Sequence, residues 1–188
     1  MTAVFRAREG DEEAFASLVQ QHSRRVFQLA FRMTRNEQDA EDVVQESFLR
    51  AYRQLSHFQA RADFGTWLYR ITANCAIDHL RHRQQKAKKH TDAIDLEHDQ
   101  LKAHTPGPER LAASAQLQQA MDDALGELTP TERAAFTLRH HEGRSIEEIC
   151  STLSLGTSAA KHAVFRAVRK LRSALAPLHA GEFRGEPS

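Results

Sequence analysis

Apolar residues recur every three or four positions through most of this chain, and a single polar stretch interrupts them. This spacing places apolar side chains on one face of an α-helix. Only 8 glycines and 5 prolines are present, too few for the turns of an all-β protein. We therefore expect an all-α fold of two small helical domains, a four-helix N-terminal domain and a C-terminal helix-turn-helix domain, joined by a flexible linker.

The first half of the chain is expected to hold four helices, at residues 11–22, 24–34, 37–55 and 64–83. Asn36 is the expected cap between the second and third of them. The pattern fails between residues 84 and 108, where basic and then acidic residues precede Pro106-Gly107-Pro108. We expect domains at 1–84 and 109–178, a linker at 85–108 with a short helical turn around 94–101, and a disordered tail at 179–188.

The second half predicts four more helices, at residues 109–125, 129–143, 145–153 and 158–176, the last stopped by Pro177. Two of these begin with a capping box, in which a Ser or Thr and a Glu three residues later satisfy each other's backbone N–H groups. These boxes are Thr129-Pro130-Thr131-Glu132 and Ser145-Ile146-Glu147-Glu148. A short helix, a turn containing Gly156 and a long helix together are typical of a helix-turn-helix.

The last predicted helix has one apolar and one basic face. The expected core stripe is Ala160, Val164, Val168, Leu171 and Leu175. The opposite face and its shoulders carry Ser158, Lys161, His162, Arg166, Arg169 and Arg172, and no acidic residue occurs from Thr157 to Ala180. A solvated basic face would also fit. The missing acids and the preceding turn favour DNA, with the first residues on base edges and later ones on phosphates.

The helix at 64–83 carries a polar stripe and lies next to several aromatic residues. The stripe is Thr66, Arg70, Asn74, Asp78 and Arg81, and the expected buried side is Leu68, Thr72, Cys75, Ala76 and His79. Trp67 lies beside the polar stripe, and the preceding loop adds Phe58, Arg61 and Phe64. Exposed aromatic side chains among basic residues suit stacking on unpaired bases. In the alternative interpretation, Trp67, Tyr69 and Phe64 complete the core.

The helix at 37–55 is acidic at its start and basic at its end. Asp39, Asp42, Glu46, Arg50 and Arg53 form one stripe, with Ala40, Val44, Phe48, Ala51 and Leu55 opposite. This order of charges suits the helix dipole. A solvated amphipathic helix and a protein-docking face both fit the pattern.

Charge and composition exclude several other classes. The balance of 26 Lys+Arg against 25 Asp+Glu excludes a globally basic nucleic-acid coat. No apolar run approaches the ~20 residues of a membrane span, and the start lacks a secretory segment, so we expect no membrane insertion and a cytoplasmic protein. Cys75 and Cys150 are expected to be reduced core thiols. His79 and His82 lack a third ligand, and no nucleophile–base pair occurs, so we expect no metal, no cofactor and no enzyme.

Three segments resemble bacterial sigma-70 family factors. Residues 39–52, DAEDVVQESFLRAY, are similar to their core-polymerase-binding segment, and residues 64–74, FGTWLYRITAN, to their promoter-melting and minus-ten helix. Residues 128–133 (LTPTER), 142–149 (EGRSIEEI) and 165–172 (FRAVRKLR) resemble the domain that reads the minus-thirty-five element. With only two domains, the chain resembles the extracytoplasmic-function (ECF, group IV) type, which binds core RNA polymerase and directs promoter recognition, melting and transcription initiation.

The resemblance implies a role for each matching residue. Polymerase binding, to the β′ clamp with the β flap as second contact, would use Asp39, Asp42, Gln45, Glu46 and Arg50. Minus-ten contacts would be made by Phe58, Arg61, Asp63, Phe64, Thr66, Trp67, Arg70, Asn74 and Arg81, the loop receiving a flipped base. Minus-thirty-five contacts would be Ser158, Lys161, His162, Arg166 and Arg169. The linker would thread toward the polymerase active-site cleft, and an anti-sigma factor is an expected partner.

The chain departs from the family at two places. Housekeeping members have two tryptophans where this chain has Trp67-Leu68, which implies weaker melting. Ala159 and Ala160 stand where many members have a basic or polar residue. Two other classes remain open from the residues alone: an autonomous helix-turn-helix regulator with a sensing or dimerising N-terminal domain, and a small helical hydrolase.

Overall fold

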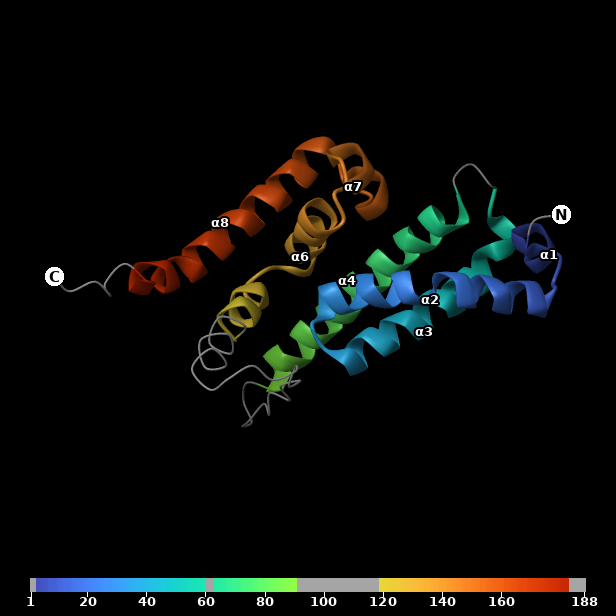
Figure 1. The fold of residues 1–188 in the computed structure, drawn as a ribbon, viewed down its shortest axis with the longest axis horizontal. Helices are drawn as coiled ribbons and strands as arrows, with labels where there is room; N and C mark the ends of the chain where they lie inside the picture. The colour runs from blue at the N-terminus through green and yellow to red at the C-terminus, as the bar shows by residue number, and fades with distance from the viewer. Residues whose placement is uncertain (1–2, 60–62, 91–118, 183–188) are drawn as a thin grey trace. The chain divides into compact units, whose positions relative to one another are not determined.

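The structure, a computed structural model, describes residues 3–59, 63–90 and 119–182. Every regular element among these residues is helical (Figure 1). The chain divides into two compact units, one built mainly from residues 1–92 and the other from most of residues 93–188. The predicted all-α class with two helical domains is therefore confirmed.

The first unit is three long helices with two short ones at one end. Its elements are α1 (Ala3–Arg8), α2 (Glu12–Thr34), α3 (Glu37–Gln54), the 3₁₀ turn η1 (Leu55–His57) and α4 (Phe64–His90). Helices α2, α3 and α4 pack side by side, each against both others (Figure 1). Their shared core includes the fully buried side chains of Leu29, Met33, Val43, Leu68 and Thr72.

Two predicted helices at 11–22 and 24–34 are in fact one helix, α2. Ser23 does not interrupt it, because its hydroxyl donates to the Val19 carbonyl at 2.6 Å and so stays within the helix. The helix ends where Arg35 adopts a left-handed φ of 59°. Asn36 then caps α3 by accepting from the Asp39 N–H at 2.9 Å, as predicted. The short helix α1 was not predicted.

Helix α4 ends at His90 and not near residue 83, so the first residues of the expected linker are helical. Lys and Gln, which fill this extension, are good helix formers, and no glycine or proline occurs in it. The expected turn around 94–101 and the rest of the linker lie outside the described residues.

The second unit contains a helical segment at residues 119–126, followed by α6 (Pro130–Phe136), the π-helical turn η2 (Thr137–His141), α7 (Ile146–Leu153) and α8 (Thr157–Glu182). Both predicted capping boxes are present, since Glu132 N–H donates to Thr129 Oγ1 at 3.2 Å and Glu148 N–H to Ser145 Oγ at 3.1 Å. The chain turns at Gly143, with a φ of 65°, close to the predicted helix end. The predicted helix-turn-helix is α7, a short turn and α8.

Helix α8 differs from the prediction in its core face and its end. Its buried residues are Ala160, Ala163, Ala167 and Leu171, whereas Val164, Val168 and Leu175 are only half-buried. The small alanines let α8 lie close to its neighbours, and the valines flank the contact. The helix also continues through Pro177 to Glu182, so the predicted stop at Pro177 is wrong. Residues 183–188 lie outside the described part.

Candidate nucleic-acid interface

The polar stripe of α4 lies at the surface of the first unit. Thr66, Arg70 and Arg81 are exposed, and Asn74 and Asp78 are half-exposed. The opposite side is buried as predicted, except that His79 is half-exposed. Arg61 is the predicted minus-ten arginine that precedes α4, and it lies outside the described residues.

An aromatic cluster of Phe58, Phe64 and Trp67 lies at the start of α4. The ring centroids are 5.0 Å apart for Phe58 and Trp67, and 5.6 Å apart for Phe64 and Trp67. Phe58 and Phe64 are only 8% and 4% exposed, whereas Trp67 is half-exposed. The expectation of several exposed aromatics is therefore wrong for Phe58 and Phe64, because each ring packs on its neighbours. The core interpretation holds for Phe64 and for Tyr69, which is also buried.

The first turn of α4 is held in place by α2. Asp63, itself exposed, accepts from the Thr66 N–H at 3.3 Å, and His22 of α2 lies with its ring centroid 5.4 Å from that of Phe64. A Cβ on Gly65 would come within 2.9 Å of Asp63 Oδ2 and 3.0 Å of His22 Cε1. Gly65 therefore permits this close approach. Neither Gly65 nor His22 was predicted, since only the fold brings residues 22 and 65 together.

The acidic stripe of α3 is divided between solvent and α4. Asp42 and Gln45 are exposed. By contrast, Asp39 pairs with Arg83 and with His79, whose Nε2 lies 3.0 Å from Asp39 Oδ1. These contacts tie α3 to the second half of α4.

Arg50 makes a second link between the same helices. It lies 2.5 Å from Glu46 Oε1 and 3.0 Å from Asp78 Oδ2, and these two carboxylates raise its pKa. Three predicted polymerase-binding residues, Asp39, Glu46 and Arg50, thus also stabilise the α3–α4 contact. Asp42 and Gln45 have no such structural role in the described residues.

The thiols and imidazoles show no metal chemistry in the described part of the chain. Cys75 is buried and free, and burial raises the pKa of its thiol. Cys150 is free and half-buried. No group of three His, Cys, Asp or Glu side chains there is arranged to hold a metal ion. Among those same residues, no helix is long and apolar enough to cross a membrane.

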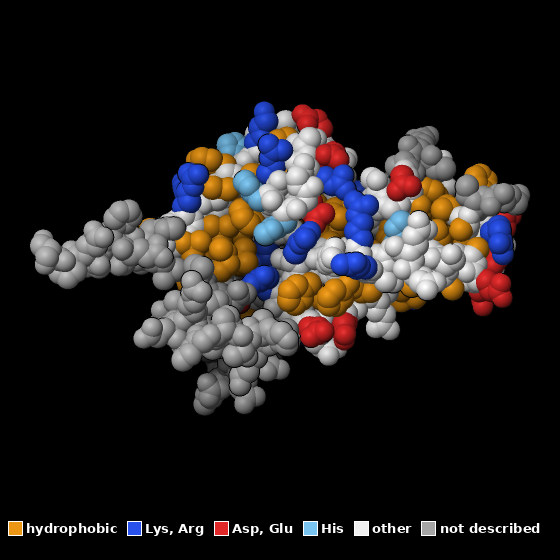
Figure 2. All heavy atoms as spheres, in the orientation of Figure 1, with side chains coloured by type: hydrophobic (Ala, Val, Ile, Leu, Met, Phe, Trp, Pro, Cys, Tyr) orange, Lys and Arg blue, Asp and Glu red, His pale blue; other side chains and the backbone are white. Residues whose placement is uncertain are grey.

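Helix α8 presents the basic face that its sequence predicts. Ser158, Lys161, His162, Arg166 and Arg169 are all exposed. Figure 2 shows Lys, Arg and His side chains along α8, with Asp and Glu appearing only toward α7. Phe165 lies among these residues with 63% of its surface exposed, an apolar side chain that the prediction did not include.

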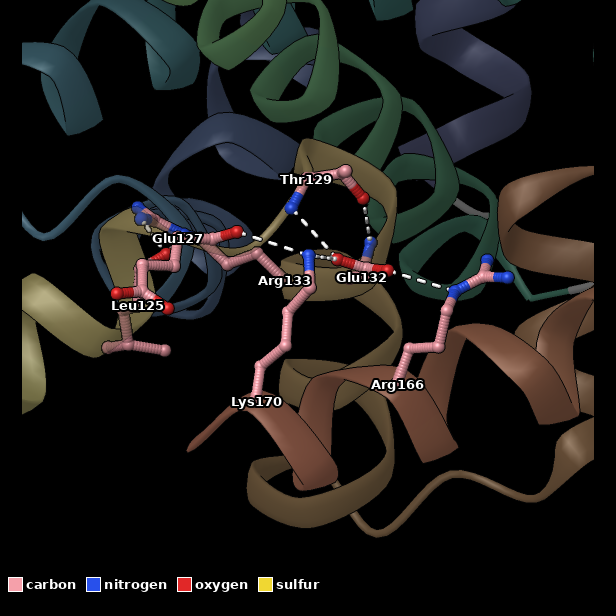
Figure 3. Close-up of polar contacts among 7 residues, drawn as sticks. All are labelled: Leu125, Glu127, Thr129, Glu132, Arg133, Arg166 and Lys170. Carbon is pink, nitrogen blue, oxygen red and sulfur yellow. Dashed lines mark hydrogen bonds and ion pairs between the residues drawn. The ribbon is translucent and has the colours of Figure 1, made fainter. Parts of the chain in front are cut away.

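A buried carboxylate anchors this face to the rest of the second unit (Figure 3). Glu132 of α6, 4% exposed, accepts from Arg166 Nε at 3.0 Å and from Lys170 Nζ at 2.8 Å. It also accepts from the Thr129 N–H at 3.1 Å. Burial raises the pKa of the Glu132 carboxyl, but Lys170, Thr129 and Arg166 outweigh this and hold it below its ordinary value. Arg166 therefore has a fixed partner before it meets any DNA.

Comparison with known proteins identifies the two units. The family model of Sigma-70 region 2 matches residues 18–86, and that of Sigma-70, region 4 matches residues 118–171. The ECF RNA polymerase sigma factor SigE of Mycolicibacterium smegmatis is 38% identical over 178 residues, covering 93% of this chain and 67% of that protein. The RNA polymerase sigma-H factor of Pseudomonas aeruginosa is 33% identical over 179 residues, covering 93% of each.

A solved structure agrees with these relatives. CnrH in complex with the cytosolic domain of CnrY matches with a TM-score of 0.61 and 25% identity, covering 93% of this chain and 96% of that chain. Region 2 followed by region 4 defines a transcription initiation factor of the sigma-70 class. The matches to SigE and sigma-H each cover 93% of this chain. The chain therefore belongs to the ECF sigma factors, which direct RNA polymerase to promoters.

Proposed function

We propose that this ECF sigma factor divides its work among three exposed helix faces. The observation that supports this is that α3, α4 and α8 each bury one side, and that the residues matching the family's functional motifs are exposed or half-exposed on the other side, except the buried Phe64. Residues 1–84 would bind polymerase and the minus-ten element, and residues 109–178 would bind the minus-thirty-five element. The protein acts in the cytoplasm, where core polymerase and promoters are, and makes or breaks no covalent bond itself.

Polymerase binding uses α3. Asp42 and Gln45 contact the β′ clamp directly, since they are exposed and unoccupied by α4. Asp39, Glu46 and Arg50 contribute at the edge of this contact and keep α3 aligned through their links to α4. The β flap provides a second attachment, to the second unit.

Minus-ten recognition uses α4 and the segment before it. Trp67 stacks on the edge of the melted DNA, supported from beneath by Phe58 and Phe64. Stacking of this kind is worth ~1–3 kcal/mol per base, and bound unpaired bases offset the cost of unpairing. The polar contacts to the strands are assigned to Arg61, Asp63, Thr66, Arg70, Asn74 and Arg81.

Minus-thirty-five recognition uses the start of α8. Ser158, Lys161 and His162 lie in its first two turns, where a recognition helix reaches base edges in the major groove. Arg166 and Arg169 follow one to two turns later. Glu132 orients the guanidinium of Arg166, so that Arg166 contacts a base edge or a phosphate from a fixed direction.

The DNA-binding surfaces of α4 and α8 each bind weakly alone, because the net charge is only +1 and the basic side chains are divided between the two surfaces. Docking on polymerase fixes the distance between them, so that binding of one raises the effective concentration of the other. Because CnrH is solved with the cytosolic domain of CnrY, we include an anti-sigma factor among the partners.

In vitro transcription with core polymerase tests the proposal. The chain is expected to direct transcripts from promoters with its own minus-ten and minus-thirty-five elements, and Lys161→Ala to lower initiation only where the minus-thirty-five element is intact. Lys86→Ala, an exposed change at the far end of α4, is the matched control. Palindromic operator binding without polymerase, and no transcript with it, would instead identify an autonomous regulator.

A further inference from the structure

Helix α2 carries a basic face that the functions above do not use. Residues 14–36 contain four arginines and no Asp or Glu. At ~100° per residue, five polar residues of α2 fall within an arc of about 100°. We name them the arginine stripe: Gln21, Arg24, Arg25, Gln28 and Arg32. The first four are exposed and Arg32 is half-exposed.

The arginine stripe lies on the side of α2 away from its core contacts. The opposite side of α2 supplies the core through Leu18, Val26, Leu29, Ala30 and Met33. Arg50 and Arg166, which join helices of the described chain, each bind a carboxylate. Arg24 and Arg25 form no ion pair with any described carboxylate, and the guanidinium of Arg25 contacts the Tyr69 ring. Exposed guanidinium groups that no carboxylate neutralises are suited to an anionic ligand.

The arginine stripe begins next to the face of α4 that is proposed to contact the minus-ten element. The guanidinium of Arg25 lies 5.3 Å from the ring centroid of Tyr69, the residue before exposed Arg70. One turn earlier on α2, His22 contacts Phe64, which in turn packs on Trp67. From this aromatic cluster the stripe continues along α2 for about 16 Å, at ~1.5 Å per residue. A surface of this length can contact more than one phosphate of a single strand.

We propose that the arginine stripe binds the phosphate backbone of the unpaired promoter strand as that strand leaves the aromatic cluster. Arg and Gln donate hydrogen bonds to phosphate oxygens without reading bases, so the contact positions the strand and is independent of sequence. The stripe itself contains no apolar anchor of the kind that forms the centre of a protein–protein interface. The inference rests on the proposed minus-ten role of α4 and adds a path for the strand beyond it.

The test compares holoenzymes on promoter DNA in which the minus-ten region is already unpaired. The variant is Arg24→Gln with Arg25→Gln, and the matched control is Arg6→Gln with Arg8→Gln, two exposed or half-exposed arginines of α1. Affinity is measured as a function of salt. Each lost single-strand contact lowers the salt slope by about 0.7 and, at 0.15 M salt, the affinity about 4-fold. The double variant should therefore lose roughly 10- to 20-fold in affinity and about 1.4 in slope.

Further variants separate this contact from folding and from the proposed function. Arg24→Gln alone, which leaves the Arg25–Tyr69 contact intact, should show about half the change in slope, and Arg24→Lys with Arg25→Lys should restore it. Arg70→Gln should weaken binding whether or not the stripe is present. An unchanged slope in the double variant, with Arg70→Gln still defective, overturns the inference but leaves the minus-ten role standing. An equal loss on fully paired DNA, or weaker binding to core enzyme alone, overturns it as well, the latter in favour of a protein-docking face.

Discussion

Glu132 joins α6 to the basic face of α8, and its charge can be removed with little change in shape. Its carboxylate is almost fully buried and receives three donors, from Arg166, Lys170 and the Thr129 backbone. Glu132→Gln keeps the shape and the capping contact but removes the charge. Breaking a buried ion pair costs about 3–5 kcal/mol, but Arg166 and Lys170 have side-chain exposures of 52% and 33% and can regain water.

We therefore expect Glu132→Gln to lower the free energy of unfolding by about 2 kcal/mol. Because the second unit has fewer than about 100 residues, this corresponds to a fall of about 8–16 °C in the Tm of that unit, measured by circular dichroism at pH 7. The matched control is Glu127→Gln, because the Glu127 side chain is exposed and only its carbonyl contacts Lys170.

The pH dependence gives a second check. The pKa of Glu132 is below its ordinary 4.5, so its stabilising effect is complete above that pH and is lost as the pH falls through the lower folded value. The difference in Tm between wild type and Glu132→Gln should therefore narrow below pH 4.5. Equal Tm values for Glu132→Gln and Glu127→Gln at pH 7 would refute this account of the cluster.

Three further predictions concern the first unit. Gly65→Ala should lower the free energy of unfolding in urea by up to about 2 kcal/mol, because its Cβ meets His22 and Asp63 at a cost of about 1–3 kcal/mol while helix propensity returns about 1 kcal/mol. Added His22→Ala should relieve the loss, and no relief would contradict the clash. Burial lowers the pKa of His22, so stability should fall as the pH drops below 6.5, and His22→Gln should remove that dependence. Trp67→Ala should weaken holoenzyme binding to pre-melted promoter DNA by about 5- to 150-fold at a temperature where circular dichroism shows the variant folded; unchanged binding would make Trp67 purely structural.

Local signals in the sequence predicted much of the fold. The capping boxes at Thr129 and Ser145 and the Asn36 cap depend on residues three apart, so they could be read directly. Ser23 and Pro177 misled the prediction for the same reason. Each weakens a helix locally, but the Ser23 hydroxyl bonds to the Val19 carbonyl and so stays within α2, and α8 continues through Pro177 to Glu182.

The contacts that connect the site to the fold could not be predicted. Arg50 and Asp78 are 28 positions apart, and Glu132 and Arg166 are 34 apart, so their pairing depends on helix packing. The sequence shows that aromatic residues stand at Phe58 and Phe64, but it does not show whether their rings face solvent or pack on each other. The faces of α3 and α4 followed the helical period, whereas the core face of α8 was predicted only in part and the partners on neighbouring helices required the structure.

The central claim is that two helical units read one promoter together only when they are bound to polymerase. The most direct measurement is the affinity of the purified chain for its promoter DNA, with and without core polymerase, on identical DNA at one salt concentration. The account predicts weak binding by the chain alone and tight, salt-sensitive binding with melting when core enzyme is added. Tight binding by the chain alone, unchanged by core enzyme, would contradict it.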